Sequence, residues 1–238
     1  MGKDSANIFF PIFVARKKED SAQTMLIIKN ASIRYGAQPL FTNFNLHLMR
    51  GETMCISGRS GCGKSSLLNA ILGFTPLYTG DITLNGIRHS KETIEQIRRQ
   101  IAWIPQELAL PVEWVSEMVQ LPFTLKINRG TPFSEEKLFA CFEELGLEQE
   151  LYRKRVSEIS GGQRQRMMIA VTAMLKKPLV IVDEPTSALD AGSSQQVLDF
   201  FRKLAEEQGS AILVVSHDKN LAAGCHRHII MEGYDGNN

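Results

Sequence analysis

The residues with the most distinctive chemistry form a glycine-rich stretch that begins at Gly58. Its spacing, G-x-x-x-x-G-K-S, ends at Lys64 and Ser65 and is met in full. Glycines let backbone N–H groups curl around a polyphosphate, a lysine can reach the outer phosphates, and a serine hydroxyl can bind Mg²⁺. The residues predicted to contact such a ligand are Gly58, Arg59, Ser60, Gly61, Cys62, Gly63, Lys64, Ser65 and Ser66.

Two adjacent acids, Asp183 and Glu184, follow the wholly apolar run Leu179–Val182. Such a run is typical of a central parallel strand that is buried on both faces. Asp183 at its carboxyl end would lie beside the glycine-rich stretch, where a carboxylate can hold Mg²⁺. We expect Glu184 on the other side of the strand end, where it could activate an attacking water. The alternative is that both acids are merely solvated.

Two further polar residues directly follow predicted strands. Gln106 comes after the strand predicted at 101–104, and His217 after the buried strand predicted at 211–215. Ligands of parallel α/β sheets bind at the carboxyl ends of the strands, so these side chains and Asp183 are expected at one edge. Gln106 could then meet a metal-bound nucleotide. Taken alone, each has an ordinary structural interpretation, as a loop glutamine or a structural histidine.

A second glycine pair lies in Ser160-Gly161-Gly162-Gln163, ahead of a helix predicted from Arg164 to Lys176. Backbone N–H groups at a helix N-terminus attract anions, so this is a second possible phosphate site. A glycine pair at a helix entry is common, and by itself it is weak evidence.

The elements that would position these residues come from the hydrophobic patterning. Short strands are predicted at 26–29, 31–35 and 44–48, which would form an antiparallel β layer ahead of the loop. Tyr35 could offer an aromatic face to an adenine ring from this layer. The loop itself lies between the apolar run at 53–57 and a helical pattern that begins at Leu67.

The character of the chain changes between Glu107 and Ser157. Apolar residues recur there at helical spacing, and Pro122 is predicted to kink or stop the first helix. Ser134 is predicted to cap a second helix that ends before Gly146. A helical insert between two parts of an α/β domain is therefore expected. Most of the apolar cluster around Trp114 should be core, with part left as a docking groove.

Bulk composition limits the function classes. The chain has 238 residues, is 43% hydrophobic and has a net charge of +1, which gives no indication of a nucleic-acid partner. Its four cysteines lack the paired spacing of a zinc site and fit a reducing compartment. No apolar run is long enough to span a bilayer, so any membrane role is expected to come through a partner. Residues 1–24 are predicted to be a loose extension.

Taken together, the ordered set resembles the nucleotide-binding subunit of ATP-binding-cassette (ABC) transporters, from Met25 to about Glu232. Ile159 stands where that family usually has leucine, a small departure. The resemblance implies the following assignments: Tyr35 in the A-loop, Gly58–Ser66 as Walker A, Gln106 in the Q-loop, Ser160–Gln163 as the signature, Asp183 closing Walker B, Glu184 as catalytic glutamate, Ser187–Asp190 as the D-loop with Asp190 near nucleotide, and His217 as the switch histidine.

The resemblance also implies the fold and the partners. It implies an α/β P-loop NTPase core with an antiparallel β layer and a helical insert, which is the ABC ATPase fold. The domain would span 25–238 with a helical subdomain at about 107–175. Two copies would pack head to tail around ATP and Mg²⁺, so that the signature of one copy completes the site of the other. Separate transmembrane permease subunits, and no nucleic acid, would be the other partners, at the cytoplasmic face of the cell membrane. Their expected docking surface is the groove near Gln106 together with the insert from Glu107 to Leu121.

Two other functions are alternatives to that of a transport ATPase. A soluble ABC ATPase that works on DNA or ribosomes usually has a coiled-coil insertion or two cassettes, and neither is found here. A regulatory cassette that recruits proteins at the membrane, as in cell division, is the stronger alternative. Leu121-Pro122-Phe123 is similar to small cassettes of metal (iron) exporters, and to those that extract lipoproteins or macrolides.

Overall fold

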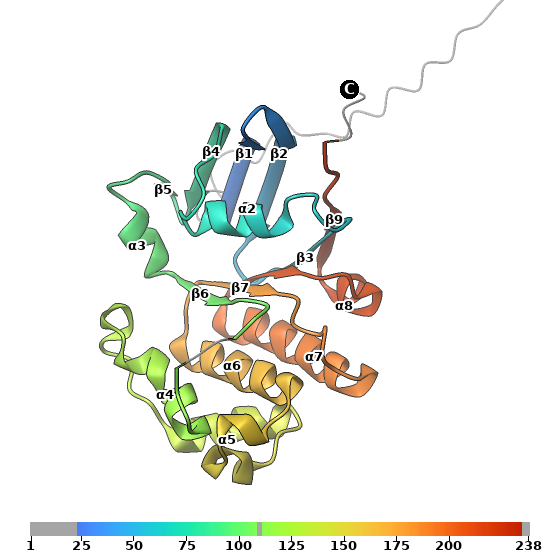
Figure 1. Cartoon of the computed structure of the whole chain (residues 1–238). Coiled ribbons are helices and arrows are strands. Elements are labelled where there is room, and N and C mark those ends of the chain that lie inside the picture. Colours follow the sequence, from blue (N-terminus) through green and yellow to red (C-terminus); the bar gives the residue numbers. More distant parts are fainter. Residues whose placement is uncertain (1–22, 109–110, 235–238) are drawn as a thin grey trace, which may run out of the picture.

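Two β-sheets of different kinds organise the chain (Figure 1). The computed structural model describes residues 23–108 and 111–234. One sheet has four antiparallel strands in the order β2-β1-β4-β5, and the other has five parallel strands in the order β6-β7-β8-β3-β9. This combination confirms the predicted α/β fold with an added antiparallel layer.

The antiparallel sheet contains β1 (Thr24–Tyr35), β2 (Gln38–Met49), β4 (Thr79–Leu84) and β5 (Ile87–Arg88). The prediction of two short strands before Tyr35 was wrong, because β1 is continuous. Asn30 takes a φ of 50° inside it, and the register with β2 shifts between Ile28 and Ala31. A β-bulge thus explains why the two halves of β1 read as separate strands.

The parallel sheet contains β3 (Thr53–Ser57), β6 (Ile101–Ile104), β7 (Leu179–Asp183), β8 (Ala211–Val215) and β9 (Arg227–Ile230). The predicted bounds of β3, β6 and β8 are confirmed. Both faces of the sheet are covered. Val180 and Val182 of β7 join the core with the helices, whereas Leu179 and Ile181 join the core shared with α2 and the antiparallel sheet. This two-sided burial is why the strands have no polar alternation.

The helices are α2 (Lys64–Ile71), α3 (Ile94–Arg98), α4 (Val115–Thr124), α5 (Glu135–Glu144), α6 (Gly161–Leu175), α7 (Ala191–Gln208) and α8 (Lys219–Gly224). Short 3₁₀ helices occur at Lys126–Asn128, Gln149–Arg153 and Val156–Glu158. Figure 1 shows α4, α5 and α6 gathered on the side of the parallel sheet that lies away from the antiparallel one. They come from the stretch between β6 and β7 that was predicted to be a helical insert.

Three details of these helices bear on the predictions. The Ser134 hydroxyl accepts a hydrogen bond from the Lys137 backbone N–H at the start of α5, which confirms the predicted cap. Pro122 lies inside α4 rather than stopping it, and the helix ends two residues later. The helix predicted from Arg164 begins earlier, at Gly161, because Ser160 caps it.

Two further expectations concern the N-terminal extension and membrane-spanning segments. Most of the predicted extension at 1–24 lies outside the described residues, although Thr24 is already the first residue of β1. Across the described ranges, we find no helix with the length and apolar character needed to cross a membrane.

Candidate nucleotide-binding site

A cavity of about 630 Å³ opens at the carboxyl edge of the parallel sheet. Parallel α/β sheets bind ligands at this edge because loops and helix N-termini converge there. Residues from both sheets and from the helix after the glycine-rich loop contribute to it. The lining consists of Tyr35, Leu40, Ser60, Gly61, Gly63, Lys64, Ser65, Ser66, Gln106, Asp183, Glu184, Thr186, Ser187, Ser216, His217 and Asp218.

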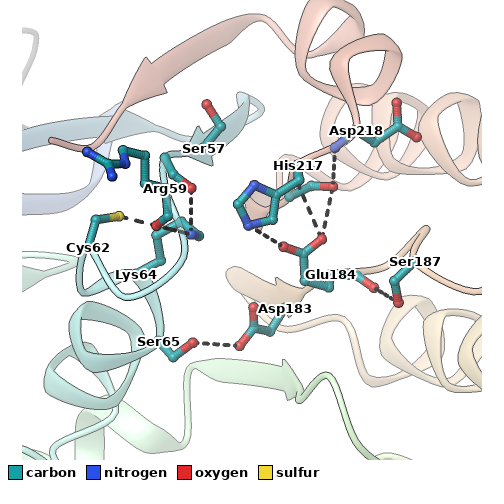
Figure 2. Close-up of polar contacts among 12 residues, drawn as sticks. Ser57, Arg59, Cys62, Lys64, Ser65, Asp183, Glu184, Ser187, His217 and Asp218 are labelled. Atoms are coloured by element: carbon teal, nitrogen blue, oxygen red, sulfur yellow. Dashed lines mark hydrogen bonds and ion pairs between the residues drawn. The ribbon is translucent and has the colours of Figure 1, made fainter. Parts of the chain in front are cut away.

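The glycine-rich loop joins β3 to α2 and wraps one side of the cavity. Gly61 and Gly63 have φ values of 80° and 107°, in the region that only glycine adopts without strain. The Lys64 ammonium donates to the carbonyl oxygens of Gly58 and Arg59 at 2.8 and 3.1 Å, so the loop folds back over its own lysine (Figure 2). Gly58, Arg59 and Cys62 were also predicted to contact ligand, but they do not line the cavity.

Asp183 at the end of β7 faces the loop. Its Oδ2 accepts a hydrogen bond from the Ser65 hydroxyl at 3.4 Å. Burial raises the pKa of the Asp183 carboxyl above its usual value, the charge of Glu184 raises it further, and Ser65 and Lys64 partly offset this. A partly buried carboxylate beside a second acid and a hydroxyl is a suitable environment for a hard divalent cation, which would stabilise the charged form. The donor set therefore fits Mg²⁺.

Glu184 departs from the geometry that its position in the sequence predicted. Strand alternation would direct it away from Asp183, yet both acids line the same cavity. The reason is a φ of 50° at Glu184, a left-handed conformation that is rare for a residue other than glycine. Its N–H donates to the Val215 carbonyl at 2.8 Å, and its own carbonyl accepts from the Ser187 hydroxyl at 3.2 Å. These bonds hold the turn that brings the two carboxylates together.

A small polar network surrounds the Glu184 carboxylate (Figure 2). The Nε2 atom of His217 lies 3.5 Å from Oε1, and Oε2 accepts from the Ser216 hydroxyl and from the His217 backbone N–H, each at 3.4 Å. The Ser216 oxygen in turn accepts from the Asp218 N–H at 3.1 Å. The network fixes one carboxylate oxygen against β8 and leaves the other beside the imidazole.

Gln106 and Tyr35 occupy the rim. Gln106 follows β6 and is exposed at the cavity, at the same sheet edge as Asp183 and His217. Tyr35 at the end of β1 is 61% exposed, and its hydroxyl lies 3.3 Å from that of Ser66. An exposed ring beside the phosphate loop is available to stack on a base.

The second glycine pair is not part of this cavity. Ser160 and Gln163 form a capping box at the start of α6: the Ser160 hydroxyl accepts from the Gln163 N–H, and the Gln163 amide oxygen accepts from the Ser160 N–H. Ser160 and Gly161 are exposed, whereas Gly162 is buried. A phosphate held in the cavity therefore has no contact with Ser160–Gln163 of the same chain.

Asp190 is also outside the cavity lining and has a structural role at the start of α7. Its carboxylate accepts hydrogen bonds from the N–H and the hydroxyl of Ser193, at 2.9 and 3.1 Å. These bonds lower the pKa of Asp190 below its usual value. The side chain thus serves as an N-cap, which leaves only its remaining lone pairs for another ligand.

Sequence reasoning did not single out four residues of the cavity. Ser216, Asp218, Thr186 and Leu40 all line it. The position of Ser216 between the end of β8 and His217 was the available signal, since a buried hydroxyl next to a polar strand end needs a partner. Leu40 carries no such signal, because an apolar residue in a β-strand is expected to be core.

Comparisons with known proteins identify the family of the chain. The family described as "ABC transporter" matches residues 41–187. The chain is 32% identical over 220 residues to an uncharacterized ABC transporter ATP-binding protein, MJ0796, of Methanocaldococcus jannaschii, covering 87% of this chain and 93% of that protein. It is 34% identical over 200 residues to a thiamine import ATP-binding protein of Shigella boydii, covering 83% and 84% of the two chains.

A solved structure is similar to this chain over most of its length. The dimeric post-hydrolysis structure of the MJ0796 cassette bound to ADP and Pi has a TM-score of 0.75 and 30% identity, and the match covers 87% of this chain and 94% of that one. This similarity extends over both sheets and the helical layer. The chain therefore belongs to the ABC transporter family and is an ATP-binding, ATP-hydrolysing subunit of that family.

Proposed function

We propose that the cavity holds the triphosphate of ATP between the glycine-rich loop and the ends of β7 and β8. The observation that carries the proposal is the convergence on one cavity of Lys64 and Ser65 from α2 with Asp183, Glu184 and His217 from two strand ends. Loop N–H groups and the Lys64 ammonium would bind the phosphates. The exposed ring of Tyr35 would stack on the adenine.

Ser65, Gln106 and Asp183 would hold Mg²⁺, which neutralises part of the phosphate charge when it is bound. The raised pKa of Asp183 and the 3.4 Å contact with Ser65 support this assignment. Glu184 would accept the proton of the attacking water, whose oxygen bonds to the γ-phosphorus as the bond to ADP breaks. His217, beside Glu184, would contact the γ-phosphate or the water.

We further propose that two copies pack head to tail, with Ser160–Gln163 and Asp190 of one copy completing the site of the other. Two observations support this pairing. Ser160–Gln163 and Asp190 lie outside the cavity lining of their own chain, and Ser160 and Gly161 are exposed at the start of α6. The structure of the MJ0796 cassette described above is dimeric. Loss of the γ-phosphate would then release the two copies.

Transmembrane permease subunits are the proposed second partner, and they would hold the chain at the cytoplasmic face of the cell membrane. A groove of about 360 Å³ beside Gln106 supports this, because its lining is largely apolar and Trp103 and Leu125 in it are 39% and 48% exposed. The names of the relatives favour a transport motor over a regulatory cassette. Those relatives include importers of thiamine and phosphonates, so metal (iron) export gains no support, and we propose no cargo.

A lysine pair tests the nucleotide site. Lys64→Ala should abolish tight binding of Mg-ATP, measured by equilibrium titration with a fluorescent ATP analogue, and should lower ATPase activity at least about 100-fold. Lys91→Ala removes an exposed lysine outside the cavity lining and should leave both unchanged. Normal affinity and turnover in Lys64→Ala would contradict the proposed site.

The permease groove can be tested separately. Leu125→Glu places a charge on an exposed apolar position that docking would bury, so the variant should no longer sediment with membranes from cells that produce it. Its ATPase activity in solution should be retained, because Leu125 does not line the nucleotide cavity. Unchanged membrane association of a soluble, folded Leu125→Glu variant would exclude this groove as the docking surface.

A further inference from the structure

After β9 the chain crosses the outside of the phosphate loop. The Met231 N–H donates to the Ser57 carbonyl at the end of β3 at 2.7 Å, and the Tyr234 N–H donates to the Leu40 carbonyl in β2 at 3.1 Å. Residues 231–234, called here the C-terminal strap, therefore join the parallel sheet to the antiparallel one directly behind the loop. Figure 1 shows this segment running from β9 towards β2.

The strap contacts the phosphate loop at Gly58, the first residue of the loop. Gly58 has a φ of 152°, and a Cβ built on it would lie 2.3 Å from the Met231 carbonyl oxygen. Only glycine can occupy this position without moving the strap or the loop. The carbonyl of Gly58 is one of the two that accept from the Lys64 ammonium, so the strap lies against the part of the loop that positions this lysine.

A second contact lies at the middle of the loop. A Cβ built on Gly233 would lie 3.2 Å from both Cα and Cβ of Cys62, which is closer than side chains ordinarily pack. The loop also packs against β2, since a Cβ on Gly63 would lie 2.7 Å from Cδ1 of Phe41. The loop is therefore packed against both β2 and the strap, and a methyl group at either of these glycines would have to displace its neighbours.

We propose that the C-terminal strap is a positioning element of the phosphate loop, and that Gly233 is the residue that sets the separation between them. The inference rests on the proposed function of the loop in binding ATP. A loop held in its binding conformation does not pay the ordering cost when the triphosphate arrives, whereas a displaced loop misaligns its N–H groups and Lys64. The strap acts on nucleotide affinity and only weakly on the turnover of bound ATP.

The test is a pair of substitutions at Gly233 with a control in the same segment. Gly233→Ala adds one methyl group against Cys62, and Gly233→Val adds a branched side chain. Glu232→Ala alters an exposed side chain and leaves the backbone of the strap in place. For each, the Kd for a fluorescent ATP analogue, the KM and kcat for ATP, and the Tm are measured on the full chain.

We expect Gly233→Val to raise Kd and KM about tenfold and Gly233→Ala about two- to fivefold, with kcat at saturating ATP and the Tm close to those of wild type. Glu232→Ala should match wild type in all four. A Kd within twofold of wild type in a folded Gly233→Val variant would overturn the inference, and so would a loss of kcat with unchanged KM. If Gly233→Val does not fold, Gly233→Ala decides by the same criteria.

Lys64→Ala separates this inference from the proposed function. If Lys64→Ala loses ATP affinity while Gly233→Val retains it, the strap has no positioning role and the nucleotide site stands. If Lys64→Ala binds ATP as wild type does, the proposed site fails and the strap has no phosphate loop to position.

Discussion

The hydroxyl of Ser65 lies 3.4 Å from Oδ2 of Asp183, although 118 residues separate them in the chain. Ser65 is in the first turn of α2, and Asp183 is the last residue of β7. Strand β8 lies between β7 and β3, the strand that leads into the phosphate loop. The contact therefore spans the site and places a hydroxyl and a carboxylate where one cation could bind both.

If both groups hold Mg²⁺, their removal should not be additive. Ser65→Ala and Asp183→Asn should each lower kcat/KM for Mg-ATP by about 10²-fold or more, and the double variant should be little worse than the more severe single variant. The measurement is ATPase activity over a Mg²⁺ titration. Fully multiplicative effects would show that Ser65 and Asp183 act independently.

Ser134→Ala is a matched control for the serine substitution. It removes a hydroxyl that caps α5 and is not part of the cavity lining. Loss of such a cap costs about 1 kcal/mol, which corresponds to a Tm lower by about 2–4 °C in a chain of this size. Its Mg²⁺ dependence should be that of wild type.

Gly162 and Gly161 are predicted to respond oppositely to a methyl group. A Cβ on Gly162 would lie 2.6 Å from Cδ2 of Leu189 and 2.7 Å from the Ala188 carbonyl oxygen, whereas one on Gly161 would meet no atom within 4 Å. Overpacking of this kind costs about 1–3 kcal/mol, so Gly162→Ala should lower the Tm by several degrees. Gly161→Ala should leave it equal or higher. Equal Tm values for the two variants would show that α6 does not pack on residues 188–189 as described.

Ser216 is predicted to position Glu184. The buried Ser216 hydroxyl donates to Oε2 of Glu184 and accepts from the Asp218 N–H. Ser216→Ala should lower kcat for ATP hydrolysis by about 10-fold with little change in KM, because the hydroxyl is engaged with the Glu184 carboxylate and the Asp218 N–H. Ser216→Thr retains a hydroxyl and should recover most of the rate. An equal loss in both variants would indicate that packing, and not the hydrogen bond, is responsible.

His89, which directly follows β5, is predicted to make the stability of the fold depend on pH. Burial lowers its pKa below 6.5, the charge of Arg98 lowers it further, and a hydrogen bond to the Ile71 carbonyl opposes this. The fold thus favours the neutral imidazole, whose stabilising contribution is present above the unfolded pKa of 6.5 and is lost as the pH falls through the lower folded pKa.

The measurement for His89 is the Tm of wild type and His89→Gln between about pH 7.5 and about pH 5. The Tm of wild type should fall more over this interval than that of the variant. Burial also lowers the pKa of His47, so some decrease should persist in the variant. A larger decrease in His89→Gln than in wild type would contradict the assigned direction.

The sequence predicted the parts of the fold that rest on local patterns. The bounds of β3, β6 and β8 follow from apolar runs that must be buried on both sides, and the loop at Gly58–Ser66 follows from its spacing. The six-residue helix α8 was not predicted, because it is too short to show helical periodicity. The early start of α6 was missed because its first two residues are glycines, which have low helix propensity.

The shape of the site depends on contacts that the sequence does not encode locally. The left-handed φ of Glu184 is held by Val215 and Ser187, which belong to other elements, and strand alternation gives the opposite side. Likewise, the local pattern of Ser160–Gln163 predicts a second phosphate site, whereas its position outside the cavity of its own chain was implied only by the family resemblance. Such features arise only after the elements have packed.

The most direct test of the account is the mass of Glu184→Gln in solution with Mg-ATP, measured by light scattering after size-exclusion chromatography. The account predicts that this variant binds ATP, hydrolyses it at a small fraction of the wild-type rate and has twice the mass of the monomer. It also predicts that adding Ser160→Arg, at the exposed start of α6, restores the monomer. A Glu184→Gln variant that binds ATP but stays monomeric, or that hydrolyses ATP as wild type does, would contradict the composite site.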